Sequence, residues 1–120
     1  MQKIKNYVDA LDVLKNELPK CFRHGDKKFP LALGIHEKVL KHFENDERFG
    51  AVTLIKAVGL YCKGTKYIST IVAGAPRIDI NGKPVSSVKK SEEEYALKIL
   101  AGRKAKRKKE VAKNRQNKQI

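Results

Sequence analysis

The sequence predicts one compact α+β domain that is mainly helical and carries a small β-hairpin layer. Three segments place apolar residues at helical spacing, a later segment alternates with a period of two, and an Asn-Gly dipeptide follows it. These patterns are typical of surface helices, strands and a tight hairpin turn. A chain of 120 residues with 41% hydrophobic content supports one core. We expect a folded domain over residues 1–100 and a basic C-terminal tail over residues 101–120, either a helix extension or disordered.

The first helix is expected over residues 4–18. Its apolar positions have the periodicity of a helix that packs on a core: Ile4, Tyr7, Val8, Leu11, Leu14 and Leu18. Pro19 disfavours the α conformation at the residue before it and ends the helix there. The apolar residues of the next loop are expected to anchor that loop to the core: Cys21, Phe22 and Phe29.

Two further helices follow. The second is expected to begin at Gly34 and Ile35, because apolar residues recur at helical spacing from there: Ile35, Val39, Leu40 and Phe43. After a charged connector, a third stripe ends near Gly64, a plausible C-terminal stop. This third stripe consists of Leu54, Ile55, Val58 and Tyr61.

Strand chemistry begins at residue 66. Residues 66–72 alternate with a period of two and are rich in β-branched side chains, which predicts a strand. Gly74-Ala75-Pro76 turns the chain into a second strand over residues 77–80. Because side chains alternate across a strand, one face should hold Ile78 and Ile80 and the other Arg77 and Asp79.

The hairpin and the last helix complete the domain. Asn81-Gly82 predicts a type I′ turn, and residues 83–88 should return as a short edge strand that tolerates proline. Ser91 and Glu94 have the spacing of a capping box, and the helix that begins there carries Tyr95, Ile99 and Leu100. Beyond Gly102 the apolar periodicity fades into basic sequence.

The charge indicates a polyanionic partner. The chain carries 27 Lys and Arg against 13 Asp and Glu, a net charge of +14. Residues 101–120 hold nine basic residues and one acidic residue, a net +8, which leaves +6 for residues 1–100. The alternative is a lysine-rich surface that only keeps the protein soluble. An anionic membrane is disfavoured, because no amphipathic segment with bulky apolar anchors accompanies the tail.

Other classes of protein are disfavoured by what the sequence lacks. There is no transmembrane run or signal peptide, and two cysteines suit a reducing compartment, so we expect a cytoplasmic protein. Cys21 and His24 would form only half of a metal site, and no cofactor motif is found. The histidines have no evident nucleophile or carboxylate pair beside them, so we expect no enzyme, metal, cofactor or small-molecule substrate.

Five motifs in order resemble a known family. They are "CF" (residues 21–22), "PLALGI" (30–35), "LY" (60–61), "KY" (66–67) and "GAPRIDINGKP" (74–84). Together they are similar to the ProQ/FinO domain of bacterial RNA-binding proteins over about residues 18–100. The resemblance implies a compact, mainly helical RNA chaperone that acts on small RNAs and messenger 3′ regions in post-transcriptional regulation. It also implies a preference for intrinsic terminators, which are hairpins followed by a single-stranded U-rich 3′ end.

The resemblance places Tyr67 and Arg77 in the family's pocket for the RNA 3′ end. Arg77 would then contact a phosphate or the terminal ribose, while Tyr67 would stack on a base or donate its hydroxyl. The residues alone leave another interpretation open. Tyr67 is then a core aromatic residue, and Arg77 pairs with Asp79 or Glu44.

Further contacts to phosphate are expected at two places. Gly34 and Ile35 would present the amides of a helix N-terminus, unless the glycine serves only a tight turn. Lys56 and Lys63, with Arg48 and Lys66 nearby, would bind the phosphates of a stem.

The third helix departs from the family, whose members often carry several basic residues along it. This chain has Ala51, Ile55 and Gly59 where some of those residues would be. Other lysines would compensate, or are ordinary solvated side chains: Lys27, Lys28, Lys38 and Lys41. The alternative function is a non-specific nucleic-acid or ribosome-associated protein whose tail supplies most of the affinity. In either case we expect a monomer that binds RNA and no membrane.

Overall fold

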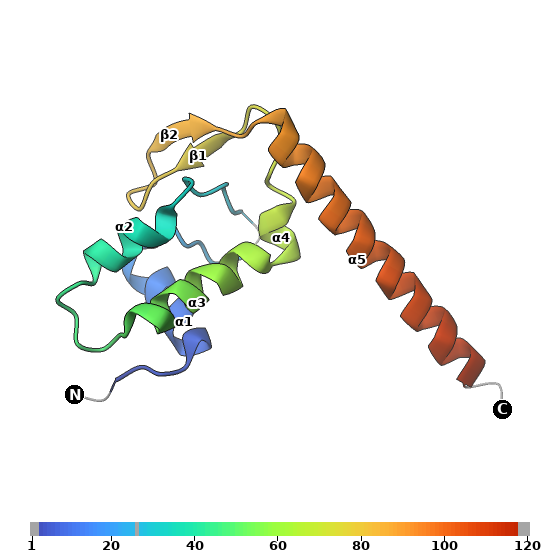
Figure 1. Cartoon of the computed structure of the whole chain (residues 1–120), viewed down its shortest axis with the longest axis horizontal. Coiled ribbons are helices and arrows are strands. Elements are labelled where there is room, and N and C mark those ends of the chain that lie inside the picture. The colour runs from blue at the N-terminus through green and yellow to red at the C-terminus, as the bar shows by residue number, and fades with distance from the viewer. Residues whose placement is uncertain (1–2, 26, 118–120) are drawn as a thin grey trace.

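Five helices and one two-stranded antiparallel sheet form the part of the chain that the computed structural model describes, residues 3–25 and 27–117, with side chains to residue 109. Their order is α1 (Tyr7–Glu17), α2 (Ile35–His42), α3 (Ala51–Lys63), α4 (Thr65–Ile68), β1 (Pro76–Ile78), β2 (Pro84–Ser87) and α5 (Lys90–Asn117). Figure 1 shows α1, α2 and α3 packed together, the hairpin above them and α5 leaving the body. The predicted α+β class, mainly helical with a small hairpin layer, is confirmed.

Helix α1 begins later than predicted because Asn6 caps it. The Asn6 side chain accepts a hydrogen bond from the Val8 N–H at 2.8 Å. Ile4 therefore precedes the helix, and its N–H donates to the Arg48 carbonyl. Tyr7 and Val8 remain 42% and 48% exposed, so the buried stripe is shorter than predicted. Its buried members are Ala10, Leu11 and Leu14, and α1 packs against α3.

Helix α2 begins, and helix α3 ends, where the sequence predicted. Gly34 has φ of 74°, a left-handed conformation that favours glycine, and α2 starts at the next residue. Helix α3 ends at Lys63 with Gly64 as its C-cap. The predicted stripe of α3 is buried except for Ile55, which is 44% exposed. In the loop before α2, Cys21 and Phe22 are buried, but Phe29 is 38% exposed and so is a weaker anchor than expected.

The predicted strand over residues 66–72 is wrong, because the chain forms the short helix α4 there. Tyr67 and Ile68 are neighbours and are both buried, which a helical turn on the core permits and a half-exposed strand does not. Two hydroxyls stabilise this turn: Ser69 Oγ donates to the Thr65 carbonyl and Thr70 Oγ1 to the Tyr67 carbonyl. Tertiary packing thus overrides the β propensity of the segment.

The hairpin forms as predicted, but its turn does not. Strands β1 and β2 are antiparallel, with Arg77 opposite Ser86 and an irregular register after Arg77. Asn81 has no positive φ, so the turn is not type I′, and Gly82 alone takes the left-handed conformation in it. The Asp79 carboxylate closes the loop instead by accepting from the N–H groups of Asn81 and Lys83, at 2.8 and 3.0 Å.

Both edges of β1 are covered by backbone hydrogen bonds. Pro30 and Ala32 exchange backbone hydrogen bonds with Ile78 on the edge away from β2. Arg77 and Ile78 are 6% and 4% exposed, so two neighbours on opposite faces of the strand are both buried. The first turn of α5 covers the face that carries Arg77.

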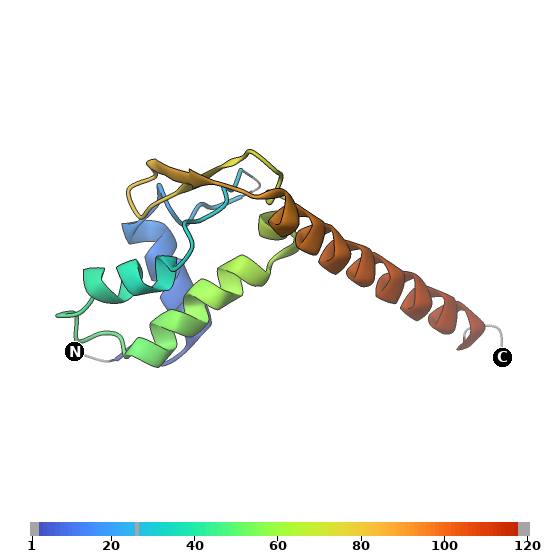
Figure 2. The ribbon, with the colours of Figure 1, turned by 45° about the horizontal axis from the view of Figure 1, so that its top comes forward.

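Helix α5 begins at Lys90, one residue before Ser91, the predicted N-cap. Glu92, not Glu94, accepts the N-terminal hydrogen bond, from the Lys89 N–H at 2.8 Å. Ala96 is buried against the body, and the later turns of α5 project away from it (Figure 2). The radius of gyration is 17.2 Å, against about 14 Å for a compact chain of this size. The described part of the tail is therefore a helix extension, and residues 118–120 lie outside the described residues.

Candidate functional site

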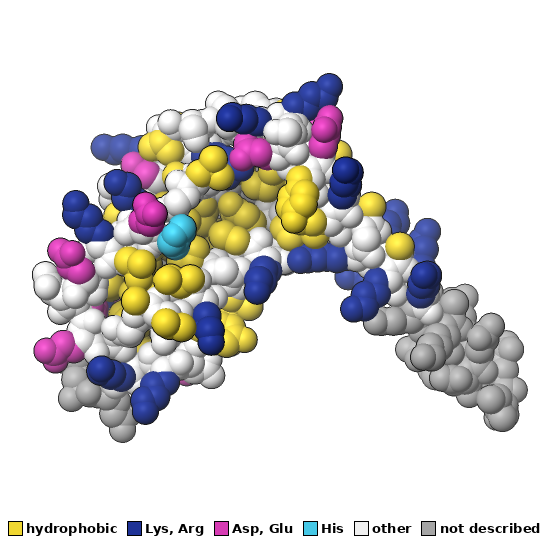
Figure 3. Space-filling model, in the orientation of Figure 1, with side chains coloured by type: hydrophobic (Ala, Val, Ile, Leu, Met, Phe, Trp, Pro, Cys, Tyr) yellow, Lys and Arg dark blue, Asp and Glu magenta, His cyan; other side chains and the backbone are white. Residues whose placement is uncertain are grey.

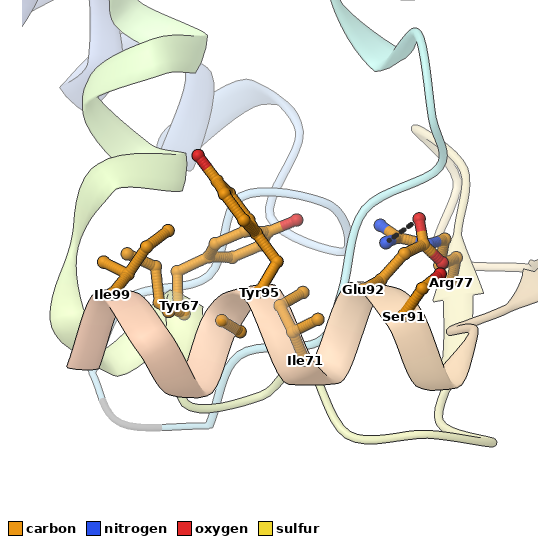
Figure 4. Close-up of a pocket in the computed structure, with 9 residues that line it drawn as sticks. Tyr67, Ile71, Arg77, Ser91, Glu92, Tyr95 and Ile99 are labelled. Carbon is orange, nitrogen blue, oxygen red and sulfur yellow. Dashed lines mark hydrogen bonds and ion pairs between the residues drawn. The ribbon is translucent and has the colours of Figure 1, made fainter. Parts of the chain in front are cut away.

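A pocket of about 370 Å³ lies where α4, β1 and α5 meet. Tyr67 and Ile71 approach it from α4 and the segment after it, and Arg77 from β1 (Figure 4). The first turns of α5 supply its other wall, which includes Ser91, Glu92, Tyr95 and Ile99. The structure thus brings Tyr67 and Arg77 to one pocket, although they do not lie on paired strands.

The Arg77 side chain at this pocket is held by two hydrogen bonds. Its Nη1 donates to the Leu31 carbonyl at 2.7 Å, and its Nη2 donates to Glu92 Oε2 at 3.0 Å. The side chain is 7% exposed, and its Nε has no hydrogen-bond partner among the described residues. An acidic partner for Arg77 was one of the two interpretations of the sequence, but that partner is Glu92 rather than Asp79 or Glu44.

Glu92 places a carboxylate beside this arginine. Its Oε1 accepts from the Lys89 N–H, and its side chain is 24% exposed. The Lys89 N–H, and then the Arg77 charge, lower the pKa of Glu92 below its ordinary value. The group is therefore ionised at neutral pH, and the pocket contains an ion pair rather than an isolated cation.

Tyr67 is both a core residue and a wall of the pocket. It is 7% exposed, and its hydroxyl accepts from the Leu31 N–H at 3.0 Å. Its ring centroid lies 5.5 Å from that of Tyr61. Burial raises the pKa of Tyr67 to about 12. Tyr67 is therefore a buried core residue, as one interpretation of the sequence held, and it also lines the pocket, as the family resemblance implied.

Tyr95 is a pocket residue that the sequence reasoning missed. It is 68% exposed, which leaves its ring accessible, whereas we had treated it only as part of an apolar helix stripe. The signal for it was the spacing of Ser91, Tyr95 and Ile99, since residues four apart share one face of a helix. Glu92 was missed because it was assigned no role in the helix cap.

The N-terminus of α2 is partly occupied. The Ile35 N–H donates to the Ala32 carbonyl, and the Glu37 N–H donates to the Gly34 carbonyl. Gly34 is exposed, but its left-handed φ already explains the glycine through the tight entry turn. This geometry favours the turn interpretation of Gly34, and contact of this end with phosphate stays a prediction.

The predicted cations differ in their surroundings. Lys38 on α2, Lys56 and Lys63 on α3 and Lys66 on α4 are all exposed. Lys56 and Lys63 also border a second hollow of about 560 Å³, together with Tyr7, Ile55, Gly59 and Leu60. Apolar side chains and a glycine therefore separate the two lysines on this face of α3.

Arg48 is bound within the protein. Its Nη2 lies 2.6 Å from Asp46 Oδ2 and 3.0 Å from Glu17 Oε1, and its guanidinium lies over the Phe49 ring. Hydrogen bonds from Arg48 lower the pKa of the Asp46 carboxyl. Two carboxylates already neutralise this cation, so a role in binding phosphate requires it to exchange partners.

Basic side chains also line α5 as it leaves the body. Arg103 Nη1 donates to Thr65 Oγ1 at 3.0 Å, which ties this part of α5 to the start of α4. Every residue from 101 to 109 is exposed. Figure 3 shows Lys and Arg along α5 and on the body, on either side of a hollow with hydrophobic side chains at its base.

Metal and nucleophile chemistry find no support in the described part of the chain. No group of three or more His, Cys, Asp or Glu residues there could hold a metal ion. Burial raises the pKa of Cys21 to about 12 and that of Cys62 to about 11, which makes both thiols poor nucleophiles. Among the helices of the described residues, none combines the length and apolar character that a membrane span requires.

These features define a small, basic α+β domain with a binding pocket at the root of a protruding basic helix. The chain belongs to the ProQ/FINO family, whose sequence model matches residues 4–113. It is 30% identical over 106 residues to the protein named RNA chaperone ProQ of Histophilus somni and to that of Idiomarina loihiensis. Each match covers 88% of this chain and 50% of the relative, so the chain spans about half the length of these curated relatives.

Two solved structures share the fold. An NMR structure of a ProQ homolog from Legionella pneumophila has a TM-score of 0.67 and 25% identity, covering 82% of this chain and 84% of that one. A crystal structure of a FinO-like RNA chaperone from Neisseria meningitidis has a TM-score of 0.63 and 20% identity, covering 75% and 88%. The relatives are named as RNA chaperones and not as enzymes, in line with the expectation of a non-catalytic protein.

Proposed function

We propose that this protein is an RNA-binding protein with RNA-chaperone activity. Its preferred ligands are structured RNAs that end in a single-stranded U-rich 3′ tail, such as intrinsic terminators of small RNAs and messengers, and it binds them as a monomer. One observation carries the proposal: in a chain of the ProQ/FINO family, a single pocket holds both Tyr67 and Arg77. The net charge of +14 supports a polyanionic partner.

The terminal nucleotide of the tail enters this pocket. A volume of about 370 Å³ is within the range of sites that hold small organic ligands. The exposed Tyr95 ring offers a platform for a base, and the Tyr67 ring lies deeper in the pocket. Arg77 orients the terminal ribose or its phosphate from β1. Apolar side chains such as Ile71 and Ile99 cover the faces of the base.

The stem of the hairpin is bound through its phosphates. Exposed lysines of the body supply part of the contact: Lys38, Lys56, Lys63 and Lys66. The basic face of α5, from Lys98 to Lys109, supplies the rest. Such contacts give affinity without sequence information. The pocket therefore determines which RNA ends are preferred, and the lysines contribute binding affinity.

A comparison of 3′ ends tests the proposal. Affinity is measured for one U-tailed hairpin with a free 3′ hydroxyl, for the same RNA with a 3′ phosphate, and for the hairpin without its tail. We expect the free end to bind most tightly and the blunt hairpin most weakly. Equal affinities for the three RNAs would contradict the pocket and leave a non-specific polyanion binder.

That non-specific binder is the second candidate, and one observation favours it. Arg77 is buried and already paired, whereas the basic residues of α5 from Lys90 to Lys109 are exposed. In this alternative the tail carries the affinity and the body is a scaffold. A second RNA without a hairpin distinguishes the two, because only the non-specific protein would bind it as tightly as a terminator at the same salt concentration.

A further inference from the structure

A carboxylate in a pocket for a polyanion calls for an explanation. Glu92 lies in the first turn of α5 with its side chain on the pocket wall, where it is ion-paired with Arg77 (Figure 4). We propose that Glu92 determines the specificity of this pocket: it accepts hydrogen bonds from the 2′,3′-diol of the terminal ribose and excludes an RNA that ends in phosphate. This inference rests on the proposed function, since it assigns a role within the same pocket.

The carboxylate has acceptor capacity left for a ligand. Glu92 Oε1 accepts a hydrogen bond from the Lys89 N–H and Oε2 accepts one from Arg77 Nη2. An ionised carboxylate offers about four lone-pair sites, so each oxygen can accept one further hydrogen bond. A vicinal diol presents two adjacent O–H donors to such a pair of oxygens. Hydrogen bonds to an ionised acceptor are also the stronger kind.

Arg77 supplies a second and independent observation. Its Nε is buried and has no hydrogen-bond partner among the described residues, in a side chain that lines the pocket and is 7% exposed. Buried polar atoms without partners are rare and call for an explanation. The explanation here is that the guanidinium completes its bonding only when a ribose oxygen or a small shift of the Glu92 pair brings an acceptor. The Arg77 donors and the Glu92 acceptors then lie side by side. This arrangement suits the ribose hydroxyls, because each hydroxyl both donates and accepts a hydrogen bond.

The ion pair also sets the preference of the pocket among anions. An isolated Arg77 would attract a terminal phosphate, which is a favoured ligand of arginine. Paired with Glu92, the guanidinium and the carboxylate sum to no net charge, and the carboxylate repels a phosphate placed beside it. The hydrogen bond from Lys89 keeps the carboxylate ionised, because it lowers the pKa of Glu92. The internal phosphates of the RNA are bound outside the pocket by the exposed lysines.

The test uses two variants of the full chain. Glu92→Gln keeps the shape of the side chain but removes its charge. Glu94→Gln is the matched control, because it removes the same charge from an exposed position of the same helix outside the pocket lining. Both are titrated with one U-tailed hairpin that carries four alternative ends: a 2′,3′-diol, a 2′-deoxy end, a 3′-deoxy end and a 3′-phosphate.

The wild-type protein should bind the diol best and the 3′-phosphate worst. The loss of a hydrogen bond to a charged group corresponds to about a tenfold change or more in affinity. Glu92→Gln should therefore lower the ratio of diol to phosphate affinity by about tenfold and blunt the response to both deoxy ends. Glu94→Gln should keep the wild-type ratios.

Two different failures can be told apart. If the wild-type protein discriminates among the ends and Glu92→Gln retains the same ratios, Glu92 only caps α5 and this inference is overturned while the proposed function stands. If the wild-type protein itself binds all four ends equally, both are overturned. Thermal melting followed by circular dichroism establishes that each variant is folded.

A second variant keeps the test valid if Glu92→Gln does not fold. Glu92→Asp retains the charge but withdraws the carboxylate by one methylene. It should still disfavour the 3′-phosphate, because the carboxylate still repels a phosphate. It should lose the response to the deoxy ends, because the shorter side chain no longer reaches the ribose hydroxyls. Full wild-type sensitivity to both hydroxyls in Glu92→Asp would overturn the inference.

Discussion

Tyr67 and Arg77 bind the two backbone polar groups of a single residue. The Leu31 N–H donates to the Tyr67 hydroxyl at 3.0 Å, and the Leu31 carbonyl accepts from Arg77 at 2.7 Å. The two side chains at the centre of the proposed RNA site thus also hold the segment before α2 against α4 and β1. A substitution at either position changes both the fold and the pocket, so each experiment needs a measure of stability beside the measure of binding.

Arg77→Lys keeps the charge but cannot reproduce the two directed hydrogen bonds to Leu31 and Glu92. We expect the free energy of unfolding to fall by about 1–3 kcal/mol, because a buried carbonyl loses its donor. We also expect a substantial loss of affinity for U-tailed hairpins. Urea denaturation gives the first quantity and titration with free and blocked 3′ ends the second. Unchanged stability together with an unchanged ratio of free to blocked ends would show that the arginine contacts are dispensable.

Tyr67→Phe separates the hydroxyl from the ring. The Leu31 N–H would lose its acceptor, at a cost of about 1–3 kcal/mol in stability. The ring would still form the wall of the pocket, so the preference for a free 3′ end should persist at a temperature where the variant is folded. Loss of that preference in a folded Tyr67→Phe protein would mean that the hydroxyl itself contacts RNA.

Tyr95→Ala tests the exposed wall of the pocket. If the ring stacks on a base, the affinity for a U-tailed hairpin should fall by about 1–3 kcal/mol, with little change in stability because the side chain is 68% exposed. Leu97→Ala is the control, since Leu97 is 57% exposed on the same helix and does not line the pocket. Equal affinities for the two variants would remove Tyr95 from the interface.

Lys56→Ala and Arg48→Ala should affect different properties. Lys56 is exposed at the second hollow, so its loss should weaken binding to every hairpin and reduce the slope of log K against log salt by about 0.9 if it contacts one phosphate. Arg48 is bound to Asp46 and Glu17, so its loss should lower stability and leave the salt slope unchanged. A flatter salt slope in Arg48→Ala would show that the arginine changes partners when RNA binds.

Truncation after Gly102 removes a net charge of +8. The affinity for all RNAs should fall and the salt slope should flatten, because fewer counterions are released. The ratio of free to blocked 3′ ends should be preserved, since the pocket lies before the cut. Identical salt slopes for the two proteins would exclude the tail from the interface.

Much of the fold could be predicted from hydrophobic period and glycine position. The start of α2 after Gly34 and the end of α3 before Gly64 depend on local sequence, and a glycine marks each of them. Residues 66–72 could not be predicted in this way, because β-branched side chains favour a strand locally. In the structure two consecutive residues, Tyr67 and Ile68, are both buried in the core. This burial requires the helical turn of α4, and it becomes visible only when α4 is packed against the rest of the domain.

The pocket could be predicted only in part for a similar reason. Tyr67 and Arg77 were selected through a family resemblance, and the structure does bring them together. Their burial depends on α5, whose first turn brings Glu92 onto Arg77. A contact across 15 residues between a strand and the next helix has no local signature, so the sequence pointed to Asp79 and Glu44 instead.

Helix α5 forms the pocket wall and the basic extension as one continuous rod. Its 28 residues correspond to about 42 Å of helix, with Glu92 and Tyr95 near the fixed end and the cations farther out. The Arg103 guanidinium donates a hydrogen bond to Thr65 Oγ1, so α5 is also attached to the start of α4 beyond the pocket wall. Gly102 precedes Arg103 in α5, and glycine has a low helix propensity, so the helix is weakest at this position. Because one continuous helix carries both features, a displacement of the basic extension on binding RNA would also move the pocket wall formed by Glu92 and Tyr95.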